Sequence, residues 1–119
     1  MELSSEFTFR ATHAVRIGQS REEPHEHSFK VVVTVQGPLK DDGFVIDFLK
    51  LRKVVTDLII SRLDGANLNE MFDQPSVENV GLWIFKKLKG PISNFGCTLV
   101  RVTLHETEKD WITVRESDL

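Results

Sequence analysis

Three of the four histidines in this 119-residue chain fall in segments whose alternating pattern predicts β-strands. His25 and His27 are two residues apart, so in a strand both side chains leave the same face. His13 ends an alternating segment that begins at Glu6, and it shares the face of that segment's apolar residues. If the two strands pair with their apolar faces together, the imidazoles converge at one end of the sheet. Three neutral imidazoles with an open fourth position describe a catalytic zinc site. The alternative is three unrelated histidines near strand ends.

Other zinc and thiol motifs do not fit the sequence. The run from His25 to Phe29 is not the metalloprotease motif H-E-x-x-H, because Phe29 stands where that motif has its second histidine. The single cysteine, Cys97, has neither a paired cysteine nor a neighbouring histidine in the sequence. We therefore expect Cys97 to be a buried structural thiol, and an internal disulfide is excluded.

Glu106 continues the apolar face of Val100, Val102 and Leu104, where an unpaired carboxylate would be costly. Either the carboxylate lies beyond the covered part of the strand and reaches solvent, or it binds a specific donor. A planar ring that presents N–H groups in a row, as a guanidine or an aminopyrimidinone does, is such a donor. His105 faces the other side and is expected at the surface.

Four strands and two helices are predicted to position these side chains. The strands are predicted over residues 6–13, 25–35, 100–106 and 111–114, with a loop over 17–24. Helices with 3-4-7-8 apolar spacing follow two N-cap residues, Asp47 and Ser76, the second helix ending at Gly90-Pro91. Because strands and helices are grouped as β-β-α-α-β-β, we predict an α+β fold, a four-stranded antiparallel sheet with two helices on one face.

Composition narrows the range of function classes. The formal net charge is −3, with 40% hydrophobic and 28% charged residues, which gives no electrostatic footprint for nucleic acid or an anionic membrane. The apolar runs are too short to span a bilayer, and the N-terminus lacks the pattern of a signal peptide. We expect a single domain over residues 1–119 in a cytoplasmic protein.

Six motifs occur in the order known from one enzyme family. They are Phe9 to His13, the pair His25 and His27, Gly43 to Phe48, Leu63-Asp64 followed by Asn67-Leu68-Asn69, Pro75 to Asn79, and Glu106-Thr107. From about Phe7 to Val114 the chain resembles the 6-pyruvoyl-tetrahydropterin synthase and 6-carboxy-tetrahydropterin synthase (QueD) family.

The resemblance implies the tunnelling fold (T-fold), in which subunits pool their sheets into barrels as trimers that stack into hexamers. It implies zinc held by three histidines, namely His13, His25 and His27. It also implies a pterin ring anchored by Glu106 beside Thr107, with Ser76 and Val77 of a neighbouring copy lining the ring pocket. We therefore expect a homo-oligomer with active sites at subunit interfaces.

The chain departs from the family pattern at its catalytic groups. The catalytic cysteine usually lies four residues before the histidine pair, where this chain has Arg21. Glu22 is the candidate acid/base in its place, with Glu23 behind it, because a branch of the family uses glutamate near this position. The alternative is two solvated loop glutamates.

Two further departures lie near the ligands and after the first helix. The family's His-Gly-His has Glu26 in its middle here, and that side chain is expected to face away from the metal. The family's Asp-His pair is Asp64-Gly65 here, so the catalytic candidate Asp64 lacks its histidine and is equally suited to cap a turn.

Together with the resemblance, which implies the substrate class, these residues lead us to expect a zinc-dependent lyase acting on the side chain of a reduced pterin, dihydroneopterin or its triphosphate. Retro-aldol cleavage of dihydroneopterin fits a glutamate acid/base best, and a synthase acting on the triphosphate is the alternative outcome. A second class is a pterin- or purine-binding member that has lost catalysis, and a third is a structural domain without metal. No nucleic acid or membrane partner is expected.

Overall fold

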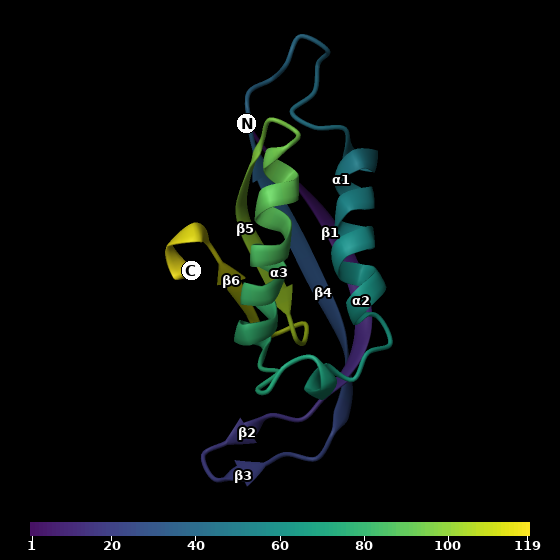
Figure 1. Cartoon of the computed structure of the whole chain (residues 1–119), viewed down its shortest axis with the longest axis vertical. Helices are drawn as coiled ribbons and strands as arrows, with labels where there is room; N and C mark the ends of the chain where they lie inside the picture. The colour runs from purple at the N-terminus through teal and green to yellow at the C-terminus, as the bar shows by residue number, and fades with distance from the viewer.

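The computed structural model describes residues 1–119, and its central element is a four-stranded antiparallel sheet in the order β1-β4-β5-β6 (Figure 1). The strands are β1 (Glu2–His13), β4 (His25–Gln36), β5 (Thr98–His105) and β6 (Trp111–Val114), and β2 (Arg16–Ile17) and β3 (Ser20–Arg21) form a separate hairpin. The helices are α1 (Phe48–Val55), α2 (Ser61–Leu63) and α3 (Val77–Ser93), with short turns η1 (Thr56–Ile60), η2 (Leu68–Glu70) and η3 (Glu116–Asp118). The predicted fold class, an α+β tunnelling fold with a four-stranded antiparallel sheet and two helices on one face, is confirmed.

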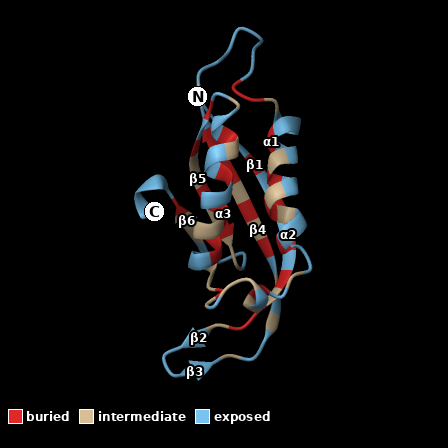
Figure 2. Cartoon of the chain, in the orientation of Figure 1, coloured by how far each residue is buried: buried red, intermediate tan, exposed pale blue.

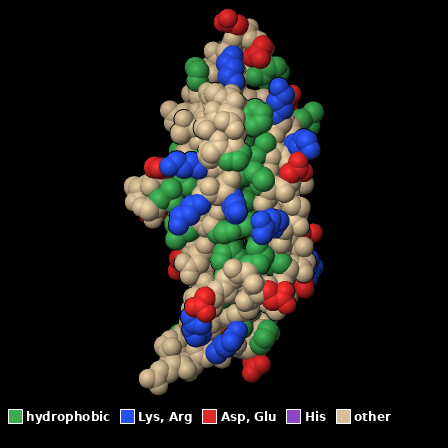
Figure 3. All heavy atoms as spheres, in the orientation of Figure 1, with side chains coloured by type: hydrophobic (Ala, Val, Ile, Leu, Met, Phe, Trp, Pro, Cys, Tyr) green, Lys and Arg blue, Asp and Glu red, His purple; other side chains and the backbone are tan.

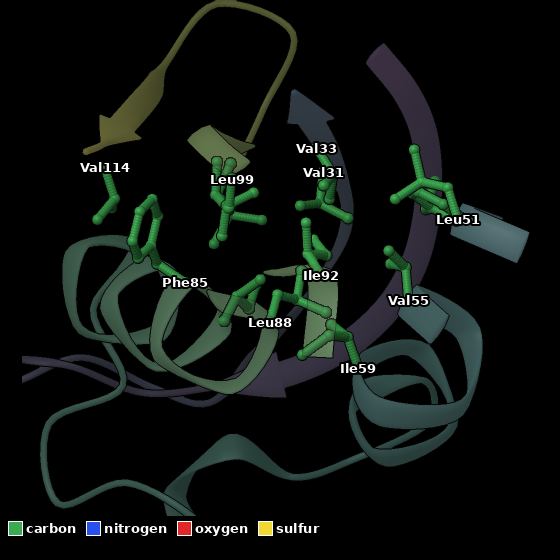
Figure 4. Close-up of a cluster of buried hydrophobic side chains, with 14 of the residues drawn as sticks. Val31, Val33, Leu51, Val55, Ile59, Phe85, Leu88, Ile92, Leu99 and Val114 are labelled. Atoms are coloured by element: carbon green, nitrogen blue, oxygen red, sulfur yellow. The ribbon is translucent and has the colours of Figure 1, made fainter. Parts of the chain in front are cut away.

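The core lies between the sheet and the helices, as the buried residues on their facing surfaces show (Figure 2). Alternation places the apolar residues of β1 and β4 on this face, and the register pairs Phe7 with Val31 and Phe9 with Phe29. Figure 4 shows the strand side chains meeting those of the helices: Val31, Val33, Leu99 and Val114 from the sheet, and Leu51, Val55, Ile59, Phe85, Leu88 and Ile92 from the helices.

The first predicted helix begins as expected, but it is not regular throughout. Asp47 is the N-cap, and its Oδ1 accepts a hydrogen bond of 2.8 Å from Leu49 N. The helix then widens into a π-type turn, η1, before α2. Ser61 Oγ donates to the Asp57 carbonyl oxygen at 2.7 Å, which gives that carbonyl a partner where the helical ladder changes.

The second predicted helix, α3, begins at the predicted N-cap, where Ser76 Oγ accepts a hydrogen bond from Asn79 N at 3.2 Å. The predicted end at Gly90-Pro91 is wrong, because α3 continues to Ser93. Pro91 removes only one backbone donor near the helix end. Burial of Ile92, which is 0% exposed, favours the additional turn.

The apolar face of β5 also differs from the prediction at one residue. The pairing of β4 with β5 shifts between Thr34 and Val35, so Leu99, Val102 and Leu104 are buried and Val100 is only half-buried. A β-bulge inserts one extra residue into β5, so the side chains before the bulge point to the opposite face of the sheet from the one that strict alternation predicts.

The predicted loop over 17–24 contains the β2–β3 hairpin, which the sequence analysis missed. Ile17 pairs with Ser20, so Gly18 and Gln19 form a two-residue turn. Gly18 has φ of 63°, a value favoured by glycine, and glycine at the first turn position is the type II′ signal that predicts such a hairpin.

None of the helices combines the length and the apolar character that crossing a membrane requires.

Candidate metal centre and active site

The three predicted ligands meet at the end of the β1–β4 pair. His13 pairs with His25 in the last step of the ladder, and His27 lies opposite Ala11 one step further in on the same face. The ring centroids are 4.7 Å apart for His13 and His25, 5.3 Å for His13 and His27, and 4.5 Å for His25 and His27. One ligand atom from each histidine and one from Glu106 all lie within 4.8 Å of one another.

His13 is the buried member of the cluster and is only 1% exposed. Its Nδ1 lies 2.8 Å from the carbonyl oxygen of Pro75, the residue before the N-cap of α3. Because a carbonyl oxygen only accepts, Nδ1 carries a proton, so in the neutral imidazole Nε2 is the atom with the lone pair. Nε2 is completely buried and makes no hydrogen bond, so it is an orphaned acceptor directed at the other ligands.

The other two histidines also suit ligation. His25 Nδ1 lies 3.0 Å from the carbonyl oxygen of Glu23, which again directs Nε2 toward the centre. Burial lowers the pKa of His27 below its ordinary value of 6.5, against the opposing charge of Glu106. A lowered pKa favours the neutral imidazole, the form that binds a metal.

Glu106 completes the cluster from the loop that follows β5. Its Oε1 lies 3.0 Å from His13 Nε2 and 3.5 Å from His27 Nε2. The first of these contacts joins two atoms that both carry lone pairs, which is unfavourable unless a cation or a proton lies between them. Ligands of a tetrahedral zinc ion with bonds of about 2.0–2.1 Å are separated by about 3.3 Å. The residues therefore fit a zinc ion, and Glu106 lies on the helix side of the sheet as predicted.

Glu22 lies at the edge of this cluster, whereas the side chain of Glu23 does not reach it. Glu22 Oε1 is 3.7 Å from His25 Nε2 and accepts a hydrogen bond of 3.0 Å from Val15 N. The backbone N–H of Glu22 donates to the carbonyl oxygen of Val15 at 3.1 Å, so the residue is held at both ends. Glu23 is exposed and contributes only its carbonyl oxygen, to His25.

The remaining predicted site residues lie around the centre rather than in it. The Asp64 carboxylate accepts from Arg10 N at 3.0 Å, which ties the end of α2 to β1. Thr107 Oγ1 accepts from the backbone N–H groups of Lys109 and Asp110, both at 3.1 Å, and thus closes the turn after Glu106. Ser76 and Val77 begin α3, directly after the carbonyl that orients His13.

Glu26 faces away from the histidines, as its position between them predicts. Its carboxylate pairs with the Arg10 guanidinium on the opposite face of the sheet. Its presence in the histidine motif therefore does not alter the ligand set.

Asn69 is a positioning residue that the sequence analysis missed. Its Oδ1 accepts from Ala14 N at 2.8 Å and its Nδ2 donates to the Ala14 carbonyl oxygen at 2.9 Å. The side-chain amide therefore pairs with the backbone directly after His13, where β1 leaves the sheet. The motif Asn67-Leu68-Asn69 was the only hint of this role in the sequence, and Asn67 in it caps η2. The role of Asn69 becomes visible only in its two hydrogen bonds to Ala14.

The sequence of the chain is also similar to the sequences of a known protein family. The family model described as 6-pyruvoyl tetrahydropterin synthase matches residues 2–117. A dihydroneopterin monophosphate aldolase of Pyrococcus furiosus is 46% identical over 82 residues, which are 69% of this chain and 69% of that protein. A 6-carboxy-5,6,7,8-tetrahydropterin synthase homologue of Archaeoglobus fulgidus is 32% identical over 108 residues, covering 91% of this chain and 90% of the other.

A solved structure agrees with these sequence matches. The 6-pyruvoyl tetrahydropterin synthase of Caenorhabditis elegans superposes with a TM-score of 0.83 at 26% identity, covering 97% of this chain and 94% of that one.

Proposed function

The chain belongs to the 6-pyruvoyl tetrahydropterin synthase family, and from that membership we propose that it is a zinc-dependent lyase that cleaves the side chain of a reduced pterin. The observation that carries the metal part of the proposal is the buried lone pair of His13 Nε2, 3.0 Å from a carboxylate oxygen of Glu106. His13, His25 and His27 would hold the zinc ion. When bound, zinc supplies Lewis-acid chemistry that makes a substrate hydroxyl more acidic.

The similarity to an aldolase favours retro-aldol cleavage over elimination of triphosphate. We propose dihydroneopterin, free or as its monophosphate, as the substrate. The bond between C1′ and C2′ of the side chain breaks after the C2′ hydroxyl loses its proton. C2′ becomes the aldehyde carbon, and the electron pair passes through C1′ to the C6=N5 imine of the ring. A proton then returns to C1′, so the products are the 6-hydroxymethyl dihydropterin and glycolaldehyde or its phosphate.

Glu22 is the proposed acid/base for these proton transfers. This role is supported by the distance of 3.7 Å between Glu22 Oε1 and His25 Nε2, and by the hydrogen bond from Val15 N that orients the carboxylate. A positioned acid/base contributes about 10²- to 10⁴-fold to a rate.

The decisive variant is Glu22→Gln, which keeps an oxygen acceptor for Val15 N–H but is not basic. We expect kcat for dihydroneopterin monophosphate to fall by about 10²- to 10⁴-fold with zinc content unchanged. Glu26→Gln is the matched control, because Glu26 faces the other side of the sheet, and it should retain activity within about twofold. Unchanged turnover in Glu22→Gln would refute the assignment, and a loss confined to Glu23→Gln would transfer the role to Glu23.

A second experiment distinguishes an enzyme from a protein that only binds pterins. Product analysis by chromatography after incubation with dihydroneopterin, its monophosphate and its triphosphate identifies the cleaved bond. Tight pterin binding without turnover of any of the three would support a non-catalytic pterin-binding protein.

We propose that Glu106 anchors the pterin ring, because its carboxylate can accept from neighbouring ring N–H groups, and that it is not the fourth zinc ligand although its Oε1 lies 3.0 Å from His13 Nε2. We expect Glu106→Gln to retain zinc on the three histidines and to lose most of its pterin affinity. Loss of zinc from this variant would instead make Glu106 a metal ligand.

We further propose that copies of this chain assemble as trimers or hexamers. Strands β1 and β6 are open edges, and Trp111 on β6 is 54% exposed. Open edges favour pairing with another chain. Analytical ultracentrifugation tests this assembly, and a fully active monomer would contradict it.

A further inference from the structure

The β2–β3 hairpin, which is followed directly by Glu22, has little stability of its own. It forms a sheet separate from the main one, with two residues in each strand, and all four of those residues are exposed. Figure 3 shows few hydrophobic side chains at the lower end of the molecule, where the hairpin lies (Figure 1). An isolated two-stranded ribbon is marginal in water, and Arg16 opposite Arg21 adds a repulsion between like charges. Contacts with the rest of the chain are therefore needed to hold Glu22 in place.

Gln74 supplies such a contact, because its side-chain amide pairs with the backbone of Arg16. Gln74 Oε1 accepts from Arg16 N at 3.0 Å, and Gln74 Nε2 donates to the Arg16 carbonyl oxygen at 2.7 Å. In the hairpin ladder, Glu22 N donates to the carbonyl oxygen of the preceding residue, Val15, at 3.1 Å. Because bonded residues alternate along an antiparallel strand, the backbone groups of Arg16 point away from β3. Gln74 thus pairs with the free edge of β2 as a neighbouring strand would.

The other contacts between the hairpin and this segment are weaker. Arg16 Nη2 donates to Asp73 Oδ2 at 3.1 Å, but the two side chains are 50% and 92% exposed, and water and salt screen such a pair. Arg16 Nη1 donates to the Asp73 carbonyl oxygen at a longer 3.4 Å. Gln74 is half-buried, and its carbonyl oxygen accepts from Asn79 Nδ2, in the first turn of α3, at 2.9 Å. The amide contact therefore ties the hairpin to an element of the core.

The contact between Gln74 and Arg16 affects the Glu22 carboxylate through Val15. Val15 N donates to Glu22 Oε1 at 3.0 Å, and this is the oxygen that lies 3.7 Å from His25 Nε2. Arg16 directly follows Val15, and its backbone groups point the other way, so Gln74 holds the strand from the edge opposite Glu22. Release of Arg16 would leave the Val15 N–H without a fixed direction, and the Glu22 carboxylate would lose its orienting donor.

We propose that Gln74 is a positioning residue for Glu22: by pairing with Arg16, its side-chain amide keeps the Glu22 carboxylate directed at the histidine cluster. The catalytic part of this inference rests on the proposed function, in which Glu22 is the acid/base. The positioning itself is a property of the fold and can be measured without turnover.

Gln74→Met tests the contact, because methionine is also unbranched and of similar length but cannot pair with both backbone groups of Arg16. We expect hydrogen–deuterium exchange in the peptides that span residues 14–23 of the zinc-loaded protein to become about 5- to 150-fold faster, the range for two lost hydrogen bonds. These peptides include the Val15 N–H, which is protected by its bond to Glu22. Exchange in α1 should not change, and circular dichroism and zinc content verify that the variant is folded.

Gln36→Met is the matched control for this substitution. Gln36 is exposed, its side chain makes no hydrogen bond, and it ends β4 at the opposite end from His25. The control should keep both the wild-type exchange in residues 14–23 and the wild-type kcat.

Turnover of dihydroneopterin monophosphate connects the positioning with the proposed acid/base. Gln74→Met should lower kcat by about 10- to 100-fold and leave KM within about twofold, because a reacting group displaced by about 1 Å can lose that much rate. In the Glu22→Gln background the same substitution should lower kcat no further, since Gln74 acts through Glu22. A merely structural role for Gln74 would lower kcat by the same factor in both backgrounds.

The outcomes distinguish the inference from the proposed function. Unchanged exchange of residues 14–23 in Gln74→Met overturns the positioning role, even if Glu22 proves to be the acid/base. Equal losses of kcat in the two backgrounds overturn the action through Glu22. Faster exchange confined to residues 14–23 supports the positioning role, even if Glu22→Gln is fully active and the acid/base assignment fails.

Discussion

Replacement of Asn69 tests whether the clamp on Ala14 holds the end of β1, and with it His13, in place. Asn69→Leu keeps a similar side-chain volume but removes the two hydrogen bonds of 2.8 and 2.9 Å to the Ala14 backbone. Each such bond contributes about 0.5–1.5 kcal/mol net, so the free energy of unfolding should fall by about 1–3 kcal/mol. Since unfolding entropy is about 2.1 cal/mol/K per residue, the 119 residues give about 0.25 kcal/mol/K, and Tm should fall by about 4–12 °C.

The assay combines thermal unfolding of the metal-free protein with a competitive zinc titration. Asn69→Leu should bind zinc more weakly than the wild type, because the backbone that follows His13 loses its fixed direction. Asn94→Leu is the matched control, since Asn94 is exposed and its side chain makes no hydrogen bond, and it should change neither quantity appreciably. A change in unfolding free energy below about 0.5 kcal/mol in Asn69→Leu, with unchanged zinc affinity, would refute the positioning role.

Three other predictions concern packing, titration and metal linkage. Gly81→Ala should change the free energy of unfolding by less than about 1 kcal/mol, because the Ile112 Cδ1 atom that its Cβ would meet at 2.6 Å is the movable end of a half-buried side chain, and alanine favours a helix interior by about 1 kcal/mol; denaturant unfolding measures this, and a loss above about 2 kcal/mol would contradict it. Burial raises the pKa of the Cys97 thiol above its ordinary value of 9.0. Near pH 9 the thiol therefore ionises only in the unfolded state, and the free energy of unfolding should fall as the pH rises above 9. Cys97→Ala should remove this pH dependence. Chelation of zinc should lower Tm in the wild type but not in His25→Ala, since zinc at 100 times its Kd stabilises the native state by about 2.7 kcal/mol; equal melting of the wild type with and without chelator would argue against a bound metal.

The sequence was sufficient to predict where the histidines converge, because that depends on local alternation and on one hydrophobic register. His25 and His27 share a face in any extended strand, and only pairing of the two apolar faces puts His13 beside them. The direction of Glu106 was predictable for the same reason, although the bulge at Val100 shows how easily one inserted residue changes the phase.

The contacts that orient the ligands could not be predicted in the same way. The bond from His13 to the Pro75 carbonyl joins residues 62 positions apart, and the clamp of Asn69 on Ala14 joins residues 55 positions apart. Both depend on how the segment between α2 and α3 packs against the end of β1. The spacing of apolar residues along the chain does not predict that packing, because the contacts form only when the helices and the sheet come together.

His13 lies opposite His25 in the last step of the β1–β4 ladder, so the candidate site has one part within the sheet and one part in the connection that leaves it. We expect the ladder and the core beneath it to determine whether the three histidines can bind a metal. The eleven-residue connection between those two histidines carries Glu22 and both hairpin arginines, and it lies outside that ladder. Because lengthening a surface connection costs little free energy, the hairpin turn at Gly18 and Gln19 can change in length without moving the histidines. Ala14 and Glu23, at the two ends of the same connection, cannot change position in this way, because their backbones contact Asn69 and His25. We therefore expect variation at the tip of the hairpin to alter the surface beside the histidines without altering how the histidines themselves are held.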